Sequence, residues 1–122
     1  MIRIRRIYDD INARDQAAIK QAQDILRQQF PGIGEGTINR LPDELRDSLR
    51  ARFRSILLVA EDIRSKVRGF ALLHHFPDLR FCYLGFISTA RGRTGRGIGG
   101  ALYERVREEA RSLGAIGLFF EV

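Results

Sequence analysis

The sequence is poor in several features that would indicate other classes of protein. It has one cysteine, Cys82, so no disulfide can form within the chain, and a lone thiol is typical of a reducing cytoplasm. Its longest apolar run, SILLVA, is far shorter than the roughly 20 residues that span a membrane. The N-terminal MIRIRRIYDD carries charge but no following apolar block, unlike a secretory signal. We therefore expect a cytoplasmic protein without a membrane segment.

Lysine is also scarce, since only Lys20 and Lys66 occur, and the net charge of +6 comes almost wholly from arginine. A basic protein favours polyanions or phosphorylated ligands, although an arginine bias without any partner is the simpler explanation. Binding of nucleic acid would require a localised basic stripe with interleaved aromatics. The arginines are instead scattered and often spaced to pair with acids, as Arg105 is with Glu109. This distribution disfavours nucleic acid as a partner, and no cluster of side chains is spaced to bind a metal.

Hydrophobic periodicity predicts a single domain over residues 1–122 with an α/β (α+β) fold in the order β-α-α-β-β-β-α-β. The predicted strands cover residues 1–8, 55–60, 67–76, 80–89 and 115–122. Asn12 caps the first helix, which ends at the FPGIGEG stretch of residues 30–36. The second helix begins near Pro42, and its apolar face is expected to comprise Leu41, Leu45, Leu49 and Phe53. The third runs from Gly97 to Leu113 before Gly114.

The stretch GRTGRGIGG, residues 92–100, places glycines where the third helix must begin. The first four backbone N–H groups of a helix have no partner within it, and no side chain around Gly97 to Gly100 is placed to cap them. Glycines let a ligand approach the backbone, and Arg91, Arg93 and Arg96 add positive charge. The pattern predicts a bound anion. A tight strand-to-helix turn without a ligand is the alternative.

Two phosphate-binding motifs fit these glycines. Gly95, Gly97 and Gly100 spell G-x-G-x-x-G, and Glu121 lies 21 residues further on, where a dinucleotide-binding fold places its ribose-binding acid. However, three strands come before the strand that leads into the motif, and only 22 residues follow Gly100, too few for the rest of a doubly wound sheet. The other motif, R/Q-x-x-G-x-G/A, is met by TGRGIG, residues 94–99, with Thr94 in its first position.

With that second motif the sequence resembles the GNAT superfamily of acyl-CoA N-acyltransferases. FISTARGRT looks like the family's fourth strand and loop, GALYERVREEARSLG like its signature helix, and LVAEDIRSKVRGFALL like its hairpin of strands two and three. The resemblance covers nearly the whole chain and is strongest over residues 55–122. It implies a GNAT-like mixed, largely antiparallel sheet with flanking helices.

The resemblance also implies an N-acetyltransferase, in which an amine on a small molecule or peptide attacks the thioester of the co-substrate acetyl-CoA directly. The backbone of Ile87 and Thr89 would bind the pantetheine arm where the fourth strand parts from the fifth. A backbone N–H there would also stabilise the oxyanion. The residues expected to hold the pyrophosphate through their amides are Thr94, Gly95, Arg96, Gly97, Ile98, Gly99 and Gly100.

Candidates for proton transfer are weaker. Glu121 lies near the expected substrate side of the fifth strand and can accept a proton through water, or it is simply a solvated carboxylate. His74 and His75 are expected to form a solvent-exposed pair near a loop. Cys82 and Tyr83 are expected to pack in or beside the sheet, and Tyr103 to pack at the core edge or touch the ligand.

The family continues past its fifth strand with a helix and two strands that this sequence does not contain. We therefore expect residues 1–122 to be the front part of a longer acyltransferase, truncated at its C-terminus, or to be completed by a partner, including a second copy in a homo-oligomer. A catalytically incomplete CoA-binding or scaffold domain is the alternative function.

Overall fold

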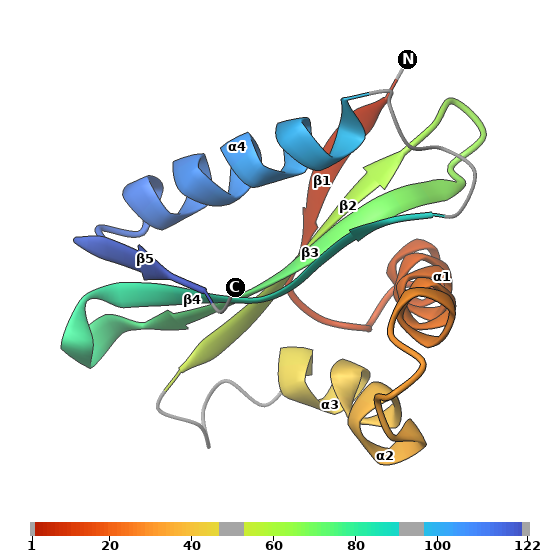
Figure 1. Cartoon of the computed structure of the whole chain (residues 1–122), viewed down its shortest axis with the longest axis horizontal. Coiled ribbons are helices and arrows are strands. Elements are labelled where there is room, and N and C mark those ends of the chain that lie inside the picture. Colours follow the sequence, from red (N-terminus) through yellow and green to blue (C-terminus); the bar gives the residue numbers. More distant parts are fainter. Residues whose placement is uncertain (1, 47–52, 91–96, 121–122) are drawn as a thin grey trace.

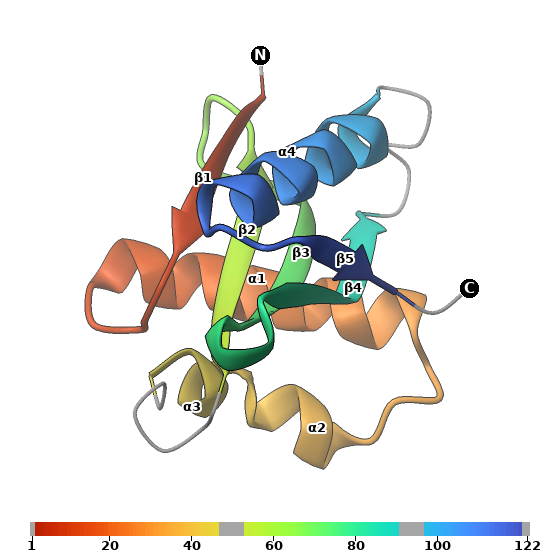
Figure 2. The ribbon, with the colours of Figure 1, turned by 90° about the vertical axis from the view of Figure 1, so that its left-hand side faces the viewer.

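The computed structural model describes residues 2–46, 53–90 and 97–120. A five-stranded sheet of order β1-β2-β3-β4-β5 separates two layers of helices, with α1, α2 and α3 on one face and α4 on the other (Figures 1 and 2). The strands are β1 Arg3–Ile7, β2 Arg54–Glu61, β3 Val67–Phe76, β4 Phe81–Thr89 and β5 Gly117–Phe119. Strands β1 to β4 pair antiparallel, whereas β4 and β5 pair parallel. The predicted α/β fold with a largely antiparallel sheet is confirmed.

Helix α1, Ala13–Gln29, begins where the sequence predicts, because the Asn12 side chain accepts a hydrogen bond of 2.8 Å from the backbone N–H of Asp15. The next segment differs from the prediction. Two short helices, α2 Glu35–Asn39 and α3 Leu41–Arg46, follow in place of one. Helix α2 begins inside the stretch that we expected to be irregular, and Phe53 lies outside any helix.

Buried side chains form a core on each face of the sheet. Leu57, Val59 and Phe70 pack against α1, α2 and α3, while Ile56, Leu58 and Leu73 pack against α4. Strand β2 is thus buried on both faces, as its uninterrupted apolar run predicts.

Helix α4, Ile98–Ser112, lies close against β3 at its N-terminal end. A Cβ added to Gly69 would lie 2.9 Å from the Ser88 carbonyl oxygen and 3.1 Å from Leu102 Cδ1. Glycine is therefore required at position 69 for this approach. Because Gly69 is paired with Thr89, the contact brings the start of α4 to the end of β4.

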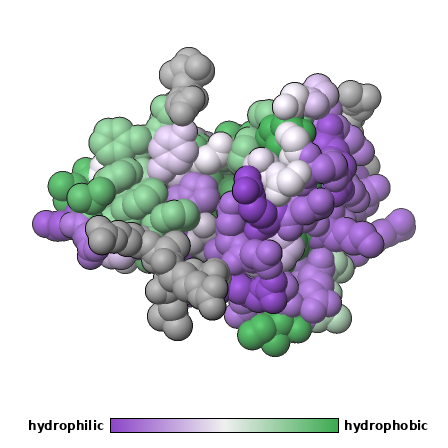
Figure 3. Space-filling view, turned by 90° about the horizontal axis from the view of Figure 1, so that it is seen from below, coloured by the Kyte–Doolittle hydropathy of each residue, from purple (hydrophilic) through white to green (hydrophobic). Residues whose placement is uncertain are grey.

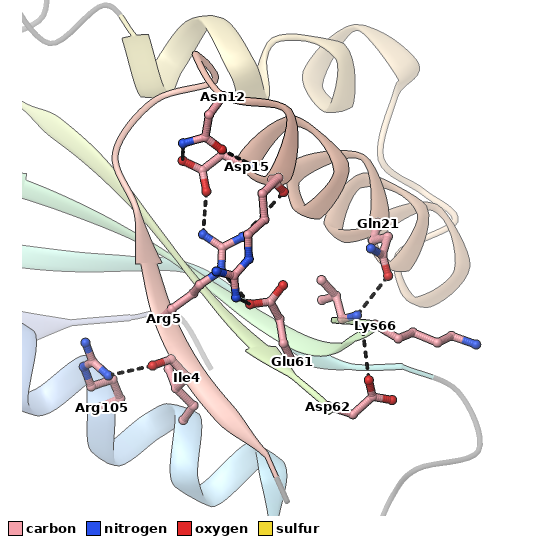
Figure 4. Close-up of polar contacts among 11 residues, drawn as sticks. Ile4, Arg5, Asn12, Asp15, Gln21, Glu61, Asp62, Lys66 and Arg105 are labelled. Carbon is pink, nitrogen blue, oxygen red and sulfur yellow. Dashed lines mark hydrogen bonds and ion pairs between the residues drawn. The ribbon is translucent and has the colours of Figure 1, made fainter. Parts of the chain in front are cut away.

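At the β1 edge of the sheet, an ionic network joins β1 to α1 and β2 (Figure 4). Arg5 lies between Asp15 and Glu61 and donates its Nε hydrogen bond to Glu61 at 2.5 Å, while Arg14 approaches the same carboxylate at 3.4 Å. Glu61 is only 3% exposed, and these arginines neutralise its buried charge.

Hydrophobic side chains also gather on the surface at the end of the molecule that carries β5 and the 3₁₀ turn Pro77–Leu79 (Figure 3). Leu79, Ile116 and Phe119 are all more than half exposed there.

Candidate active site

The free edge of β4 is the first component of the site. Strand β5 pairs only with Phe81 to Tyr83, so within the described residues the rest of β4 has no strand partner on that side. On the other side, the Ala90 N–H donates to the Arg68 carbonyl at 2.8 Å, which makes these two a hydrogen-bonded pair. Bonded and non-bonded pairs alternate along an antiparallel ladder, so Ile87 and Thr89 direct their N–H and C=O groups away from β3, towards the open edge.

The N-terminus of α4 is the second component. Its N-cap residue is Gly97, with a left-handed φ of 74°, and no side chain caps the helix. Ala101 N–H makes the first helical bond, to the Gly97 carbonyl at 2.9 Å, which leaves the N–H groups of Ile98, Gly99 and Gly100 without a helical acceptor. A Cβ on Gly99 would lie 3.9 Å from Thr89 Cγ2. The helix donors therefore continue directly from the open edge of β4.

Several residues that the sequence places at this site lie outside the described residues. They are Arg91, Arg93, Thr94, Gly95, Arg96 and Glu121.

A cleft of about 230 Å³ on the α1–α3 face of the sheet is the third component. Its lining is mostly apolar and includes Phe53, Phe76 and Phe86. Two titratable side chains also line it. Burial raises the pKa of the Glu44 carboxyl, an effect that Arg40 partly offsets, and burial lowers the pKa of the His74 imidazole.

His74 does not match the predicted exposed pair. Its imidazole is half-buried, and its Nδ1 lies 2.9 Å from the hydroxyl of the buried Ser55, its cross-strand neighbour. The ring also lies over Gly85, where a Cβ would come within 3.0 Å of Nε2. His75 is half-buried too, and burial together with Arg54 lowers its pKa. Strand alternation places the two rings on opposite faces, but only the fold shows that His74 faces a cleft.

The remaining sequence candidates are structural or undecided. Cys82 is fully buried in the sheet, and burial raises the pKa of its thiol to about 11, which removes it as a nucleophile near neutral pH. The Tyr83 ring stacks on His74 at 6.4 Å between centroids. Tyr103 is half-buried beside the α4 core, with its ring 6.1 Å from that of Phe120. Within residues 2–46, 53–90 and 97–120 no three His, Cys, Asp or Glu side chains are grouped to hold a metal ion.

The match to a family model decides the family. The Acetyltransferase (GNAT) family matches residues 19–122. The chain belongs to this acetyltransferase family. The dinucleotide-binding alternative is wrong, because the described sheet has a single parallel pair where that fold has a mostly parallel sheet. No helix in the described part of the GNAT chain is long and apolar enough to cross a membrane.

Solved structures support the GNAT fold at low sequence identity. Tetrahymena GCN5 superposes with a TM-score of 0.84 and 16% identity, over 98% of this chain and 70% of that one. The catalytic domain of Tetrahymena GCN5 histone acetyltransferase in complex with coenzyme A superposes with a TM-score of 0.74 and 17% identity, over 97% of this chain and 66% of that one. An aminoglycoside acetyltransferase from an uncultured soil metagenomic sample, in complex with sisomicin, superposes with a TM-score of 0.74 and 12% identity, over 99% of this chain and 77% of that one. A search of curated protein sequences finds no significant match.

Proposed function

We propose that this GNAT domain transfers an acetyl group from acetyl-CoA to an amine. The observation that carries the proposal is the pair Gly99 and Gly100 in the first turn of α4. Each glycine costs the helix up to about 1 kcal/mol relative to alanine. Neither has a positive φ, and no described atom would clash with a Cβ on either one. The fold therefore does not require them, whereas close approach of a ligand to their amides would.

The free edge of β4 extends this anion site into one for a peptide-like arm. Ile87 and Thr89 offer outward N–H and C=O groups that can pair with the amides of pantetheine as a strand would. The helix donors of Ile98, Gly99 and Gly100, with the helix dipole, suit a pyrophosphate. The neighbour solved in complex with coenzyme A has the same fold, which supports this ligand for the chain. Thr94, Gly95, Arg96 and Gly97 would complete the cradle.

The chemistry requires few protein groups. As the amine nitrogen bonds to the thioester carbon, an outward backbone N–H of β4 stabilises the negative charge on the carbonyl oxygen. The carbon–sulfur bond then breaks, the thiolate leaves, and the amine loses one proton. Glu121 accepts that proton through water in this proposal, and the thiolate takes one from solvent.

Ligand-dependent thermal unfolding tests the cofactor. At 100 times Kd, acetyl-CoA should add about 2.7 kcal/mol to the free energy of unfolding, and NAD should add nothing. A thiol-release assay with a panel of amines then tests turnover. A shift with NAD but not with acetyl-CoA would contradict the proposal. Binding of acetyl-CoA without transfer to any amine would support the CoA-binding or scaffold function instead.

A further inference from the structure

The cleft on the α1–α3 face has the size and chemistry of a small-molecule site. Its volume of about 230 Å³ is slightly smaller than that of typical ligand pockets, which begin at about 300 Å³, and leaves room for one ring and a short chain. Its apolar wall is formed by Leu26, Ile33, Leu41, Phe53, Phe76 and Phe86. The only polar side chains among the described lining residues are Thr37, Glu44 and His74.

Glu44 is an unbalanced charge in this lining. Its side chain is half-buried, and no hydrogen bond or ion pair joins it to any described residue, although Arg40 is near enough to lower its pKa. The two buried carboxylates of the described residues are paired, Glu61 with Arg5 and Glu109 with Arg6. A carboxylate among apolar side chains gains free energy when a cationic group enters. The described lining thus combines an apolar wall with a single acidic side chain, Glu44.

One wall of the cleft borders the proposed transfer site. Phe86 lines the cleft and is adjacent to Ile87, whose backbone faces the free edge of β4. His74 also lines it and rests on Gly85, at the point where the pairing of β3 and β4 shifts register. An acceptor bound in the cleft therefore reaches β4 just beyond Tyr83, the last residue paired with β5.

We propose that this cleft binds the acetyl acceptor, and that the acceptor is a primary amine carried on an aromatic or branched aliphatic group. The inference rests on the proposed function for the transfer itself. Glu44 attracts the ammonium form, which loses a proton to solvent before it attacks. A polyhydroxylated acceptor, such as the aminoglycoside bound by one structural neighbour, fits poorly, because only three of the described lining side chains are polar and can replace its hydration.

Binding is tested first without acetyl-CoA, by titrating 2-phenylethylamine into the chain and following the methyl NMR signals of Leu41 and Leu72. We expect saturable shifts, much weaker ones with 2-phenylethanol, which lacks the charge, and none with neamine. Glu44→Gln should weaken binding of the amine roughly tenfold or more, because a charged hydrogen bond is lost. The matched control is Glu108→Gln, an exposed carboxylate on α4, which should change nothing. Absence of shifts, or equal affinity in Glu44→Gln and wild type, overturns the inference.

Transfer is tested next, by thiol release from acetyl-CoA. We expect kcat/KM for 2-phenylethylamine to exceed that for neamine at least about tenfold, since the ring buries apolar area in the cleft. Phe53→Ala should raise KM for the amine and leave the Kd of acetyl-CoA unchanged. Faster acetylation of neamine would overturn the inference. Binding of the amine without any binding of acetyl-CoA would instead refute the proposed function and leave the amine site standing.

Discussion

Gly100→Ala separates the stability of α4 from its use as an anion site. Gly100 is the third residue of the helix, its φ is not left-handed, and a Cβ there would meet no described atom within 4 Å. Alanine should therefore stabilise the fold by about 0.5–1 kcal/mol, through helix propensity and a less flexible unfolded chain. For a chain of this length that is a rise in Tm of about 2–4 °C.

The same methyl group should weaken binding of acetyl-CoA. Cα–Cβ bonds in a helix tilt towards its N-terminus, so the methyl projects towards the open amides of the first turn. A pyrophosphate in contact with the Gly100 amide would have to shift, and a cost of about 1.4 kcal/mol corresponds to a tenfold higher Kd. We therefore expect a protein that is more stable yet binds acetyl-CoA about ten times more weakly, measured by thermal unfolding and calorimetric titration.

Gly36→Ala is the matched control, because Gly36 lies in the first turn of α2 and a Cβ there also meets no described atom. It should raise stability without changing the Kd of acetyl-CoA. Gly97 is unsuitable for this test, since its φ of 74° strains any side chain whether or not a ligand is present. An unchanged Kd in Gly100→Ala, together with a higher Tm, would show that no phosphate contacts this amide.

Three further outcomes are expected. Gly69→Ala should destabilise the domain by about 1–3 kcal/mol in denaturant unfolding, because its methyl group would meet Ser88 and Leu102. A loss of stability below about 0.5 kcal/mol, close to the error of such measurements, would mean that α4 can shift to make room. Burial lowers the pKa of His74, so the neutral ring contributes stability that is present above its unfolded pKa of about 6.5 and is lost as pH falls through the folded pKa. His74→Gln should flatten the fall in stability below that pH more than His75→Gln does, and equal slopes would contradict this. Cys82, with a pKa of about 11 and no exposure, should resist iodoacetamide at pH 8 until urea unfolds the chain, as intact mass would report.

The sequence predicted most of the fold because its hydrophobic periods are clear. The stripe of α1 is buried at Ala18, Ala22 and Leu26, and β2 is buried on both faces. Helix α2 was missed because Pro31 and the two early glycines of FPGIGEG, Gly32 and Gly34, predicted an irregular stretch over residues 30–36. In the structure Gly34 is the extended N-cap, and burial of Ile38 against α1 supplies what the local sequence lacks. A helix of five residues depends on such tertiary contacts, which no local pattern contains.

The anion site was predictable in part. Open helix donors and adjacent arginines follow from the sequence, but glycine there has two meanings. Gly97 is needed for its backbone conformation, which agrees with the turn-only alternative at that position, whereas Gly99 and Gly100 have no such need. Only the φ angles and the surrounding space separate the two cases. The role of Glu121 stays a prediction.

The proposed amine cleft could not be predicted from the sequence. The position of His74 in its wall depends on Gly85, a residue of the neighbouring strand β4 that has no side chain. His74 lines the cleft because Gly85, across the β3–β4 pair, leaves room for the imidazole. A shift of register between Leu72 and Leu73 decides which residue of β4 lies there. In the sequence Gly85 is a lone glycine in an apolar strand, a signal shared by bulges and by close backbone contacts of every kind. Ser55, directly opposite His74 on β2, has its hydroxyl 2.9 Å from Nδ1 and so helps to orient the ring. The three residues come from three strands, and they meet because of how the strands pair. The sequence therefore predicted an exposed histidine pair, whereas in the structure His74 forms part of the wall of the cleft.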